Sequence, residues 1–338
     1  LSDWGALAWR RSDSVSGHEN SELFRAVGSF LGVPQCQDPS MAARAGARAA
    51  VLGLPFDAGG HPRRTGARLG PSAIRMMSTD MVRHHRPEDA ENRDPVAALG
   101  LVDLGDIPVL HGDHDGSLAR MEAAYTAVLK AGIVPIGIGG DGMVSVPAMA
   151  ALSAAYPGLA VVHLDSHTDA YPPKPGVNAP PLDPATTFGY AVERGYVMPE
   201  LSVHAGLRGF AYVPGVFAHA EALGYRLIPM STIEAEGIPA TAARIREIVG
   251  DAPVFLCVDM DVFDPATAPG VFTPAWGGLT AREGLGLLRG LAGLDIVGAD
   301  INTMTPGFDV QGQTAWLAAT VALELLYLIA ASPRLRAE

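Results

Sequence analysis

Two short segments of the chain carry side chains of the kinds that bind divalent metal ions. The five residues are Asp165, His167, Asp169, Asp259 and Asp261. Four carboxylates and one imidazole make a hard, oxygen-rich donor set, which suits Mn²⁺, Ni²⁺ or another octahedral ion better than a thiolate-type zinc site does. So many acids held together would repel one another unless a cation neutralised them. The sequence therefore predicts a metal site, and acids that only cap helices or loops are the alternative interpretation.

Each segment follows an apolar run rich in β-branched residues, which predicts a strand that ends where the ligands begin. Residues two apart in a strand point to the same side, so Asp165 and His167 project together, as do Asp259 and Asp261. Asp169 follows in the loop. Because open α/β sheets place their sites at the carboxyl ends of strands, we expect the two segments to meet at that edge.

Strand-like and helix-like runs alternate along the chain, which predicts an α/β fold with a mainly parallel sheet of about eight strands and helices on both faces. The expected strands are residues 49–54, 99–104, 133–138, 159–164, 201–206, 225–228, 254–258 and 295–299. A helix is expected at 117–131. Residues 1–48 are expected to form an N-terminal extension with a short helix around 21–31, and residues 49–338 a single domain.

The composition narrows the classes of function. The 338 residues carry a formal net charge of −12, which argues against nucleic acid and anionic membrane surfaces as partners. Two distant cysteines and no basic-then-apolar leader favour the cytoplasm. Residues 315–331 are almost continuously apolar, but they contain Glu324 and fall short of the roughly 20 residues of a membrane span. We expect a buried terminal helix that ends before Pro333.

Several motifs around these ligands resemble those of the ureohydrolase superfamily of arginase and agmatinase, and agmatinase more than arginase. The matching segments are 139–141 (Gly-Gly-Asp), 165–169 (Asp-Ser-His-Thr-Asp) and 259–270, with supporting segments at 30–34, 53–57, 66–71 and 103–106. They occur in the family's order over about 300 residues, and ordered agreement is far more specific than one motif.

The resemblance implies the three-layer, arginase-like α/β fold and a pair of divalent ions, usually Mn²⁺ and in some relatives Ni²⁺. In the family the ions share a hydroxide that attacks a guanidino carbon and releases urea or a related product. Matched by motif, Asp165, Asp169 and Asp259 belong to the first ion. Asp165, His167, Asp259 and Asp261 belong to the second.

The chain departs from the family at three working positions. Gly142 stands where the Gly-Gly-Asp-His signature has a histidine ligand of the first ion. Pro184 stands at the histidine that handles protons, and proline can neither donate nor accept one. Thr303 stands at the glutamate that holds the guanidinium, and threonine offers no charged bidentate partner. The pattern predicts a site that is vacant or holds a single ion.

Losses in metal binding, proton transfer and substrate binding favour one common cause. We expect a non-catalytic or weakly active subunit that assembles with a catalytic paralogue in a trimer or hexamer, as the resemblance to nickel-dependent, heteromeric metformin hydrolases implies. Such a complex would hydrolyse a guanidine- or biguanide-type C–N bond.

Two alternatives stay open. One is an active amidinohydrolase with a remodelled, mononuclear metal site and an uncharged or substituted substrate. The other is a homomeric ligand-binding protein of the same fold. The remaining histidines near these segments are candidate bases by position alone, and none is assigned a role because a packed histidine is the more frequent case. They are His111, His114, His163 and His204.

Overall fold

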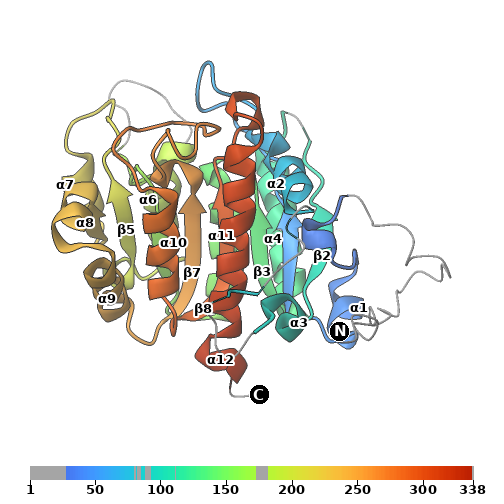
Figure 1. The fold of residues 1–338 in the computed structure, drawn as a ribbon. Helices are drawn as coiled ribbons and strands as arrows, with labels where there is room; N and C mark the ends of the chain where they lie inside the picture. Colours follow the sequence, from blue (N-terminus) through green and yellow to red (C-terminus); the bar gives the residue numbers. More distant parts are fainter. Residues whose placement is uncertain are drawn as a thin grey trace, which may run out of the picture.

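The fold is a single sheet of eight strands with helices on both faces (Figure 1). The computed structural model describes residues 28–79, 81, 85–87, 93–110, 112–172 and 182–336. The strands are β1 (Ala49–Gly53), β2 (Val102–Asp106), β3 (Val134–Ile138), β4 (Ala160–Leu164), β5 (Val203–Leu207), β6 (Arg226–Pro229), β7 (Pro253–Asp259) and β8 (Asp295–Asn302). Their order is β2-β1-β3-β8-β7-β4-β5-β6, and every pairing in this sheet is parallel. The predicted α/β class and its eight strands are confirmed.

One strand begins later than the sequence suggested. Residues 99–104 were expected to be extended, but α3 (Pro95–Leu99) takes up the first of them and β2 begins only at Val102. The Asp94 side chain caps this helix by accepting hydrogen bonds from its first free backbone N–H groups, and Gly100 ends it at a φ of 52°. The caps at Asp94 and Gly100 therefore make the start of this apolar run helical rather than extended.

Two apolar cores lie on opposite faces of the sheet, as the alternation of strand residues requires. In β1, Ala49 and Val51 belong to one core, while Ala50 and Leu52 belong to the other. The helices that contribute to the first are chiefly α2 (Gly70–Ser78), α9 (Ile238–Val249), α10 (Ala281–Gly290) and α11 (Gln313–Ala330). Those of the second are chiefly α4 (His114–Lys130), α5 (Ser145–Ala155), α6 (Thr187–Glu193) and α7 (Val216–Ala222). The expected three layers are thus present.

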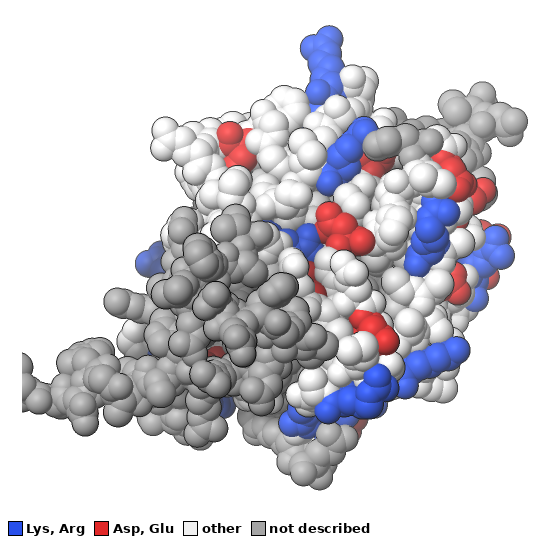
Figure 2. Space-filling model, turned by 90° about the vertical axis from the view of Figure 1, so that its right-hand side faces the viewer, with Lys and Arg blue, Asp and Glu red and all other residues white. Residues whose placement is uncertain are grey.

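The remaining elements are short. They are α1 (Pro39–Arg44), α8 (Met230–Glu236), α12 (Pro333–Arg336) and the 3₁₀ turns η2 (Phe30–Gly32), η3 (Ala67–Leu69), η4 (Gly142–Val144), η5 (Pro184–Thr186), η6 (Pro199–Leu201), η7 (Met260–Val262) and η8 (Pro306–Phe308). The helix expected at 117–131 begins earlier, at His114, because Asp113 caps it. Figure 2 shows basic and acidic side chains interspersed over one face of the molecule.

The apolar helix α11 is long enough to cross a membrane by length and composition. It is also 72% buried within the protein, where it packs against β8, α2 and α10. Glu324, in its second half, is buried and receives hydrogen bonds from the Arg289 guanidinium at 2.8 and 2.9 Å. These contacts are those of a core helix, as the sequence predicted.

Residues 28–48 lie against the sheet. Phe30 is fully buried, and its backbone N–H donates to Oδ2 of Asp103 on β2 at 2.8 Å. Gln35 forms a parallel bridge with the same aspartate. Most of the helix expected around 21–31 lies outside the described residues, and its described end is the turn η2. The domain boundary at residue 48 stays a prediction.

The contribution of this segment is measurable. Phe30→Ala is expected to lower the free energy of unfolding by about 3–5 kcal/mol, since it empties a fully buried aromatic site. Met41→Ala, at a methionine that is 39% exposed in α1, should cost well under half of that. Urea denaturation measures both changes. Equal losses would show that Phe30 does not anchor the segment to the core.

Candidate metal centre

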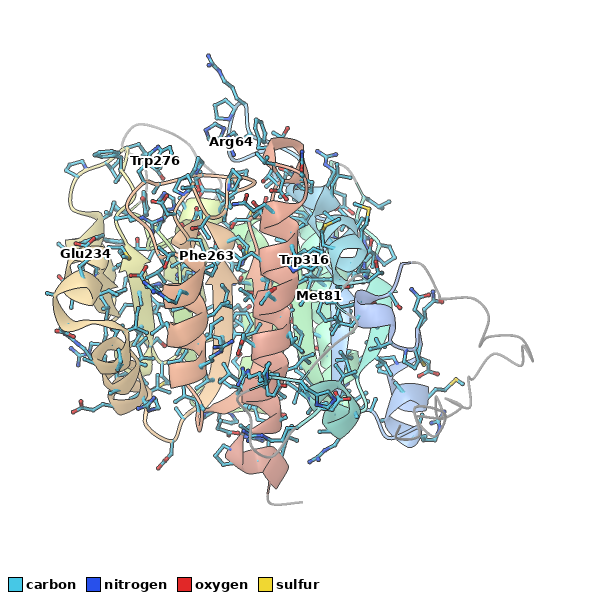
Figure 3. All side chains as sticks on the ribbon, viewed as in Figure 1. Arg64, Met81, Glu234, Phe263, Trp276 and Trp316 are labelled. Carbon is cyan, nitrogen blue, oxygen red and sulfur yellow. The ribbon has the colours of Figure 1, made fainter. Side chains whose placement is uncertain are left out.

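The two ligand segments meet because β4 and β7 are neighbours in the sheet. Their register pairs His163 with Cys257 and Leu164 with Val258, so the next residues on the two strands, Asp165 and Asp259, emerge side by side. Asp165 and Asp259 lie at the carboxyl edge of the parallel sheet, where the loops that follow the strands come together. Figure 3 shows Arg64 and Trp276 at the same end of the molecule. The expected meeting of the segments is thus what the structure shows.

The five residues predicted as ligands fall into two groups that share Asp165. In the first, oxygens of Asp165, Asp169 and Asp259 lie within 4.8 Å of one another and of a nitrogen of His163. In the second, ligand atoms of Asp165, His167 and Asp261 lie equally close together. Asp165, Asp259 and Asp261 are at most 2% exposed. The structure therefore brings all five together, and their binding of an ion stays a prediction.

The second group is held in place by its surroundings. Nδ1 of His167 lies 3.4 Å from Oδ1 of Asp165 and 3.4 Å from Oδ2 of Asp261. Asp261 in turn accepts hydrogen bonds from the hydroxyls of Ser166 and Thr273, at 3.0 and 2.9 Å. Such outer contacts fix the orientation of ligand side chains. Gly142 is not among the residues of this group.

The acids of the cluster lie close enough to change one another's pKa values. Burial, and then the charge of Asp165, raises the pKa of Asp259 to about 7. Burial and the charges of Asp165 and Asp259 likewise raise the pKa of Asp169 well above its ordinary value. Burial would also raise the pKa of Asp165, but His163 holds it well below the ordinary value. Oδ2 of Asp165 is buried without a hydrogen-bond partner. Carboxylates in this state fit a hard divalent ion.

Gly142 lies at the first group. A Cβ atom built on it would stand 3.1 Å from Oδ2 of Asp169 and 3.9 Å from Oδ2 of Asp259. Its φ lies outside the left-handed region, so other residues can adopt this backbone. A side chain here would point at the first group, which agrees with the missing histidine inferred from the family motif.

Pro184 lies beside Gly142. Its carbonyl oxygen would be 3.7 Å from a Cβ on Gly142, and its ring would be 3.0 Å from a Cβ on Gly60. Proline is the first residue of η5, where Asp183 caps the turn. Pro184 supplies no proton-transfer group at this position.

Thr303 is hydrogen-bonded to the segment that contains Asp259 and Asp261. It is 4% exposed, its hydroxyl donates to the carbonyl of Asn302 at 2.8 Å, and it accepts from the backbone N–H of Met260 at 3.1 Å. Met260 separates Asp259 from Asp261. The φ of Thr303 is 62°, an unusual value for a β-branched residue. The hydroxyl is engaged by the backbone that positions the ligands, so it offers a guanidinium no charged partner.

Sequence reasoning missed two residues next to the ligands. The sequence offers His163 as a candidate base by position alone and assigns it no role, but it lies two residues before Asp165 on the same face. Its Nε2 is 3.2 Å from Oδ2 of Asp165 and 3.5 Å from Oδ1 of Asp259. Cys257 occupies the corresponding position before Asp259. The period-two spacing in each strand was the signal that would have found both.

The other histidines have different surroundings. His204 is fully buried and its Nδ1 lies 2.7 Å from Nδ1 of His163. Burial and the neighbouring His163 lower the pKa of His204 well below its ordinary value. His114 begins α4 and packs edge-on against Phe56, with ring centroids 5.4 Å apart. His111 lies outside the described residues.

A buried acid behind the centre should make stability depend on pH. Burial raises the pKa of Asp300 to about 6, although hydrogen bonds such as that from Ser145, at 2.7 Å, oppose the shift. The folded chain thus binds this proton more tightly than the unfolded chain does. The free energy of unfolding should therefore fall as pH rises from about 4 to about 6, by roughly 3 kcal/mol for this group.

Asp300→Asn removes the titrating group and keeps the shape. Its free energy of unfolding should depend less steeply on pH than that of the wild type between pH 4 and 7. Urea denaturation in the presence of a chelator measures both curves without a contribution from bound metal. Parallel curves would mean that Asp300 is ionised in the folded chain throughout this range.

Comparisons with known proteins bear on this geometry. The model of the arginase family matches residues 47–327. The chain belongs to the arginase family. It is similar to a guanidinopropionase of Pseudomonas aeruginosa, with 40% identity over 310 residues that cover 91% of this chain and 93% of the relative. An agmatinase of Neisseria meningitidis is 35% identical over 280 residues, with 82% and 86% covered.

Solved structures agree with this family assignment. A proclavaminate amidino hydrolase from Streptomyces clavuligerus superposes with a TM-score of 0.83 at 34% identity, over 90% of this chain and 97% of that one. A Trypanosoma cruzi formiminoglutamase with Mn²⁺ gives a TM-score of 0.75 at 25% identity, over 85% and 95% of the two chains. The arginase-like fold is therefore established, and the donor set of this arginase-family chain fits the kind of ion that the second structure contains.

Proposed function

We propose that this chain is a metal-dependent hydrolase of amidine C–N bonds whose remodelled site holds one hard divalent ion. The observation that carries the proposal is the second ligand group, in which Asp165, His167 and Asp261 converge and are braced by Ser166 and Thr273. The replacement of histidine by Gly142 removes no residue of this group. Mn²⁺ and Ni²⁺ are the ions that suit its donors best.

Each residue has a definite part in this proposal. Asp165, His167 and Asp261 hold the ion, with Asp259 beside them. When bound, such an ion lets water act as a nucleophile at neutral pH and stabilises negative charge that develops on the substrate. Asp169 is half-buried, and loss of solvent around its carboxylate together with the charges of Asp165 and Asp259 raises its pKa well above the ordinary value, so we assign it the part of a proton carrier beside the ion.

The substrate class follows from what the site lacks. Thr303 is hydrogen-bonded to Met260 and Asn302, so no carboxylate holds a guanidinium at that position. An uncharged or substituted amidine is therefore a better substrate than a free guanidinium cation. Relatives named guanidinopropionase, agmatinase and proclavaminate amidino hydrolase support the reaction class. They do not specify the substrate of this chain.

A second candidate function is that of a non-catalytic subunit in a heteromeric ureohydrolase. The observation that favours it is the clustering of three substitutions, since Gly142, Pro184 and Thr303 all lie at or directly behind the first ligand group. In that case a catalytic paralogue, in a trimer or hexamer, would hydrolyse the guanidine- or biguanide-type bond, as in metformin hydrolases. This chain would supply interface and stability.

Expression of the chain alone and with such a paralogue separates the two functions. Metal content per chain and release of urea or amine from a panel of neutral and substituted amidines are measured for both preparations. Turnover by the isolated chain with about one ion bound supports the hydrolase. A metal-loaded but inactive isolated chain that raises the activity of a co-purified paralogue would replace it with the subunit.

A further inference from the structure

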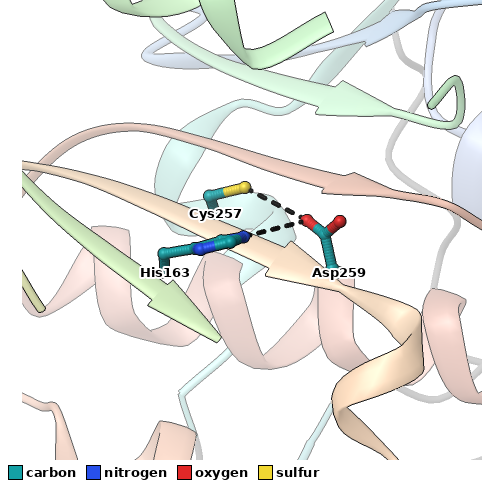
Figure 4. Close-up of side chains that lie close together, drawn as sticks. All are labelled: His163, Cys257 and Asp259. Carbon is teal, nitrogen blue, oxygen red and sulfur yellow. Dashed lines mark hydrogen bonds and ion pairs between the residues drawn. The ribbon is translucent and has the colours of Figure 1, made fainter. Parts of the chain in front are cut away.

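Directly beneath the acidic cluster lies a donor set of a different chemical kind. His163, Cys257 and Asp259 each contribute one atom to a group whose members all lie within 4.8 Å of one another (Figure 4). Oδ1 of Asp259 is 3.5 Å from Nε2 of His163 and 3.4 Å from Sγ of Cys257. The three side chains are at most 2% exposed. The set combines a soft sulfur donor with nitrogen and oxygen.

The sheet register builds this group. His163 on β4 and Cys257 on β7 are paired residues, and they stand side by side on the same face of the sheet. Asp259 follows Cys257 by two residues and returns to that face. Because both strands lie in the middle of the eight-stranded sheet, the group is held by rigid backbone rather than by loops.

The imidazole of His163 directs one ring nitrogen into the group. Nδ1 of its ring lies 2.7 Å from Nδ1 of the buried His204, and ring contact with Phe188, 4.2 Å between centroids, holds its plane. Nε2 is buried and lies 3.2 Å from Oδ2 of Asp165 and 3.5 Å from Oδ1 of Asp259, but it forms no well-aligned hydrogen bond with either carboxylate. An ion bound within the group would give this buried nitrogen a directed partner.

We propose that His163, Cys257 and Asp259 form a second metal position that takes a thiophilic divalent ion such as Zn²⁺. One thiolate, one imidazole and one carboxylate make three protein ligands of the types that Zn²⁺ prefers. Binding displaces the thiol proton of Cys257, and any proton on Nε2 of His163, to the solvent as the metal bonds form. Cys257 is a free cysteine whose Sγ also lies 3.4 Å from Oγ of Ser145 and from Nδ2 of Asn302.

This position competes with the hard-ion cluster above it. Asp259 and His163 also belong to the first acidic group, so an ion bound to Cys257 takes both residues away from a hard ion at that group. The second group, Asp165, His167 and Asp261, contains neither Cys257 nor His163. Binding of an ion to His163, Cys257 and Asp259 requires no hydrolytic activity of the chain.

Cobalt(II) is a suitable probe because its thiolate complexes absorb in the near ultraviolet. The metal-free full-length chain is titrated with Co²⁺, and we expect a charge-transfer band that saturates at one equivalent. Cys257→Ser should abolish this band. Cys36→Ser, the matched control at the other cysteine, should retain it. His163→Asn should weaken Co²⁺ binding at least about 10-fold.

A measurement on the unaltered chain guards against a variant that fails to fold. X-ray absorption of the chain loaded with one equivalent of Zn²⁺ should show one sulfur neighbour at about 2.3 Å. A shell of oxygen and nitrogen alone, with tightly bound Zn²⁺, would overturn the proposal. So would a Co²⁺ band that persists in Cys257→Ser, or a failure of the chain to bind either ion.

Discussion

Asp165→Asn is expected to lower the affinity of the chain for Mn²⁺ or Ni²⁺ at least about 100-fold and to remove any amidine hydrolysis with it. We expect this large effect because of where Asp165 lies. Asp165 is the one residue common to both hard-ligand groups, and its Oδ2 is buried without a hydrogen-bond partner. The amide keeps the volume but supplies neither the charge nor the second oxygen that a hard ion requires.

Isothermal titration with Mn²⁺ and Ni²⁺ measures the change, together with metal content after dialysis. Asp115→Asn is the matched control, because it makes the same replacement at an exposed residue in the first turn of α4. Its affinity should equal that of the wild type. If Asp165→Asn destabilises the chain, Asp261→Asn repeats the test within the second group. Unchanged affinity in both variants would mean that the acids do not bind the ion.

Gly142→His is expected to raise the number of bound hard ions from one to two per chain. A Cβ at this residue points to Oδ2 of Asp169 at 3.1 Å, so Asp169 must shift by a few tenths of an ångström to admit it. The new imidazole is then expected to join Asp165, Asp169 and Asp259 as a further ligand of the first group. Metal analysis after gel filtration measures the stoichiometry.

Activity should not rise in parallel. Pro184 still lacks a proton-transfer group and Thr303 still lacks a charge for a guanidinium, so the second ion adds no substrate binding. Gly142→Ala is the control, since it adds the Cβ without a ligand and should leave the stoichiometry at one. Fast hydrolysis of a guanidine by Gly142→His alone would show that Pro184 and Thr303 are not losses of function.

The two replacements address different parts of one centre. Asp165 tests whether the acids bind metal at all, whereas Gly142 tests why a pair of ions is not expected. If Asp165→Asn lowers the affinity for hard ions but Gly142→His does not raise the number of bound ions, the first position is already occupied by an ion held through His163 and Cys257. The Co²⁺ titration above detects that case directly.

Much of the fold was predictable because its signals are local. Strands such as residues 133–138 and 159–164 are short apolar runs bounded by turn residues, and they occur within one or two residues of the predicted bounds. The exception was 99–104, where Asp94 and Gly100 enclose a short helix. Helix caps at this scale compete with apolar runs, and pattern alone does not decide between them.

By itself, the sequence determined the α/β class, the two ligand segments and the three departures at Gly142, Pro184 and Thr303, because spacing within a segment and ordered motifs can be read along the chain. Tertiary structure alone decided which side chains from separate segments meet. Strand order places β7 beside β4, although their residues lie about 90 positions apart, and so sets His163 beside Cys257. Register across a parallel sheet depends on the packing of both faces, which no single segment encodes.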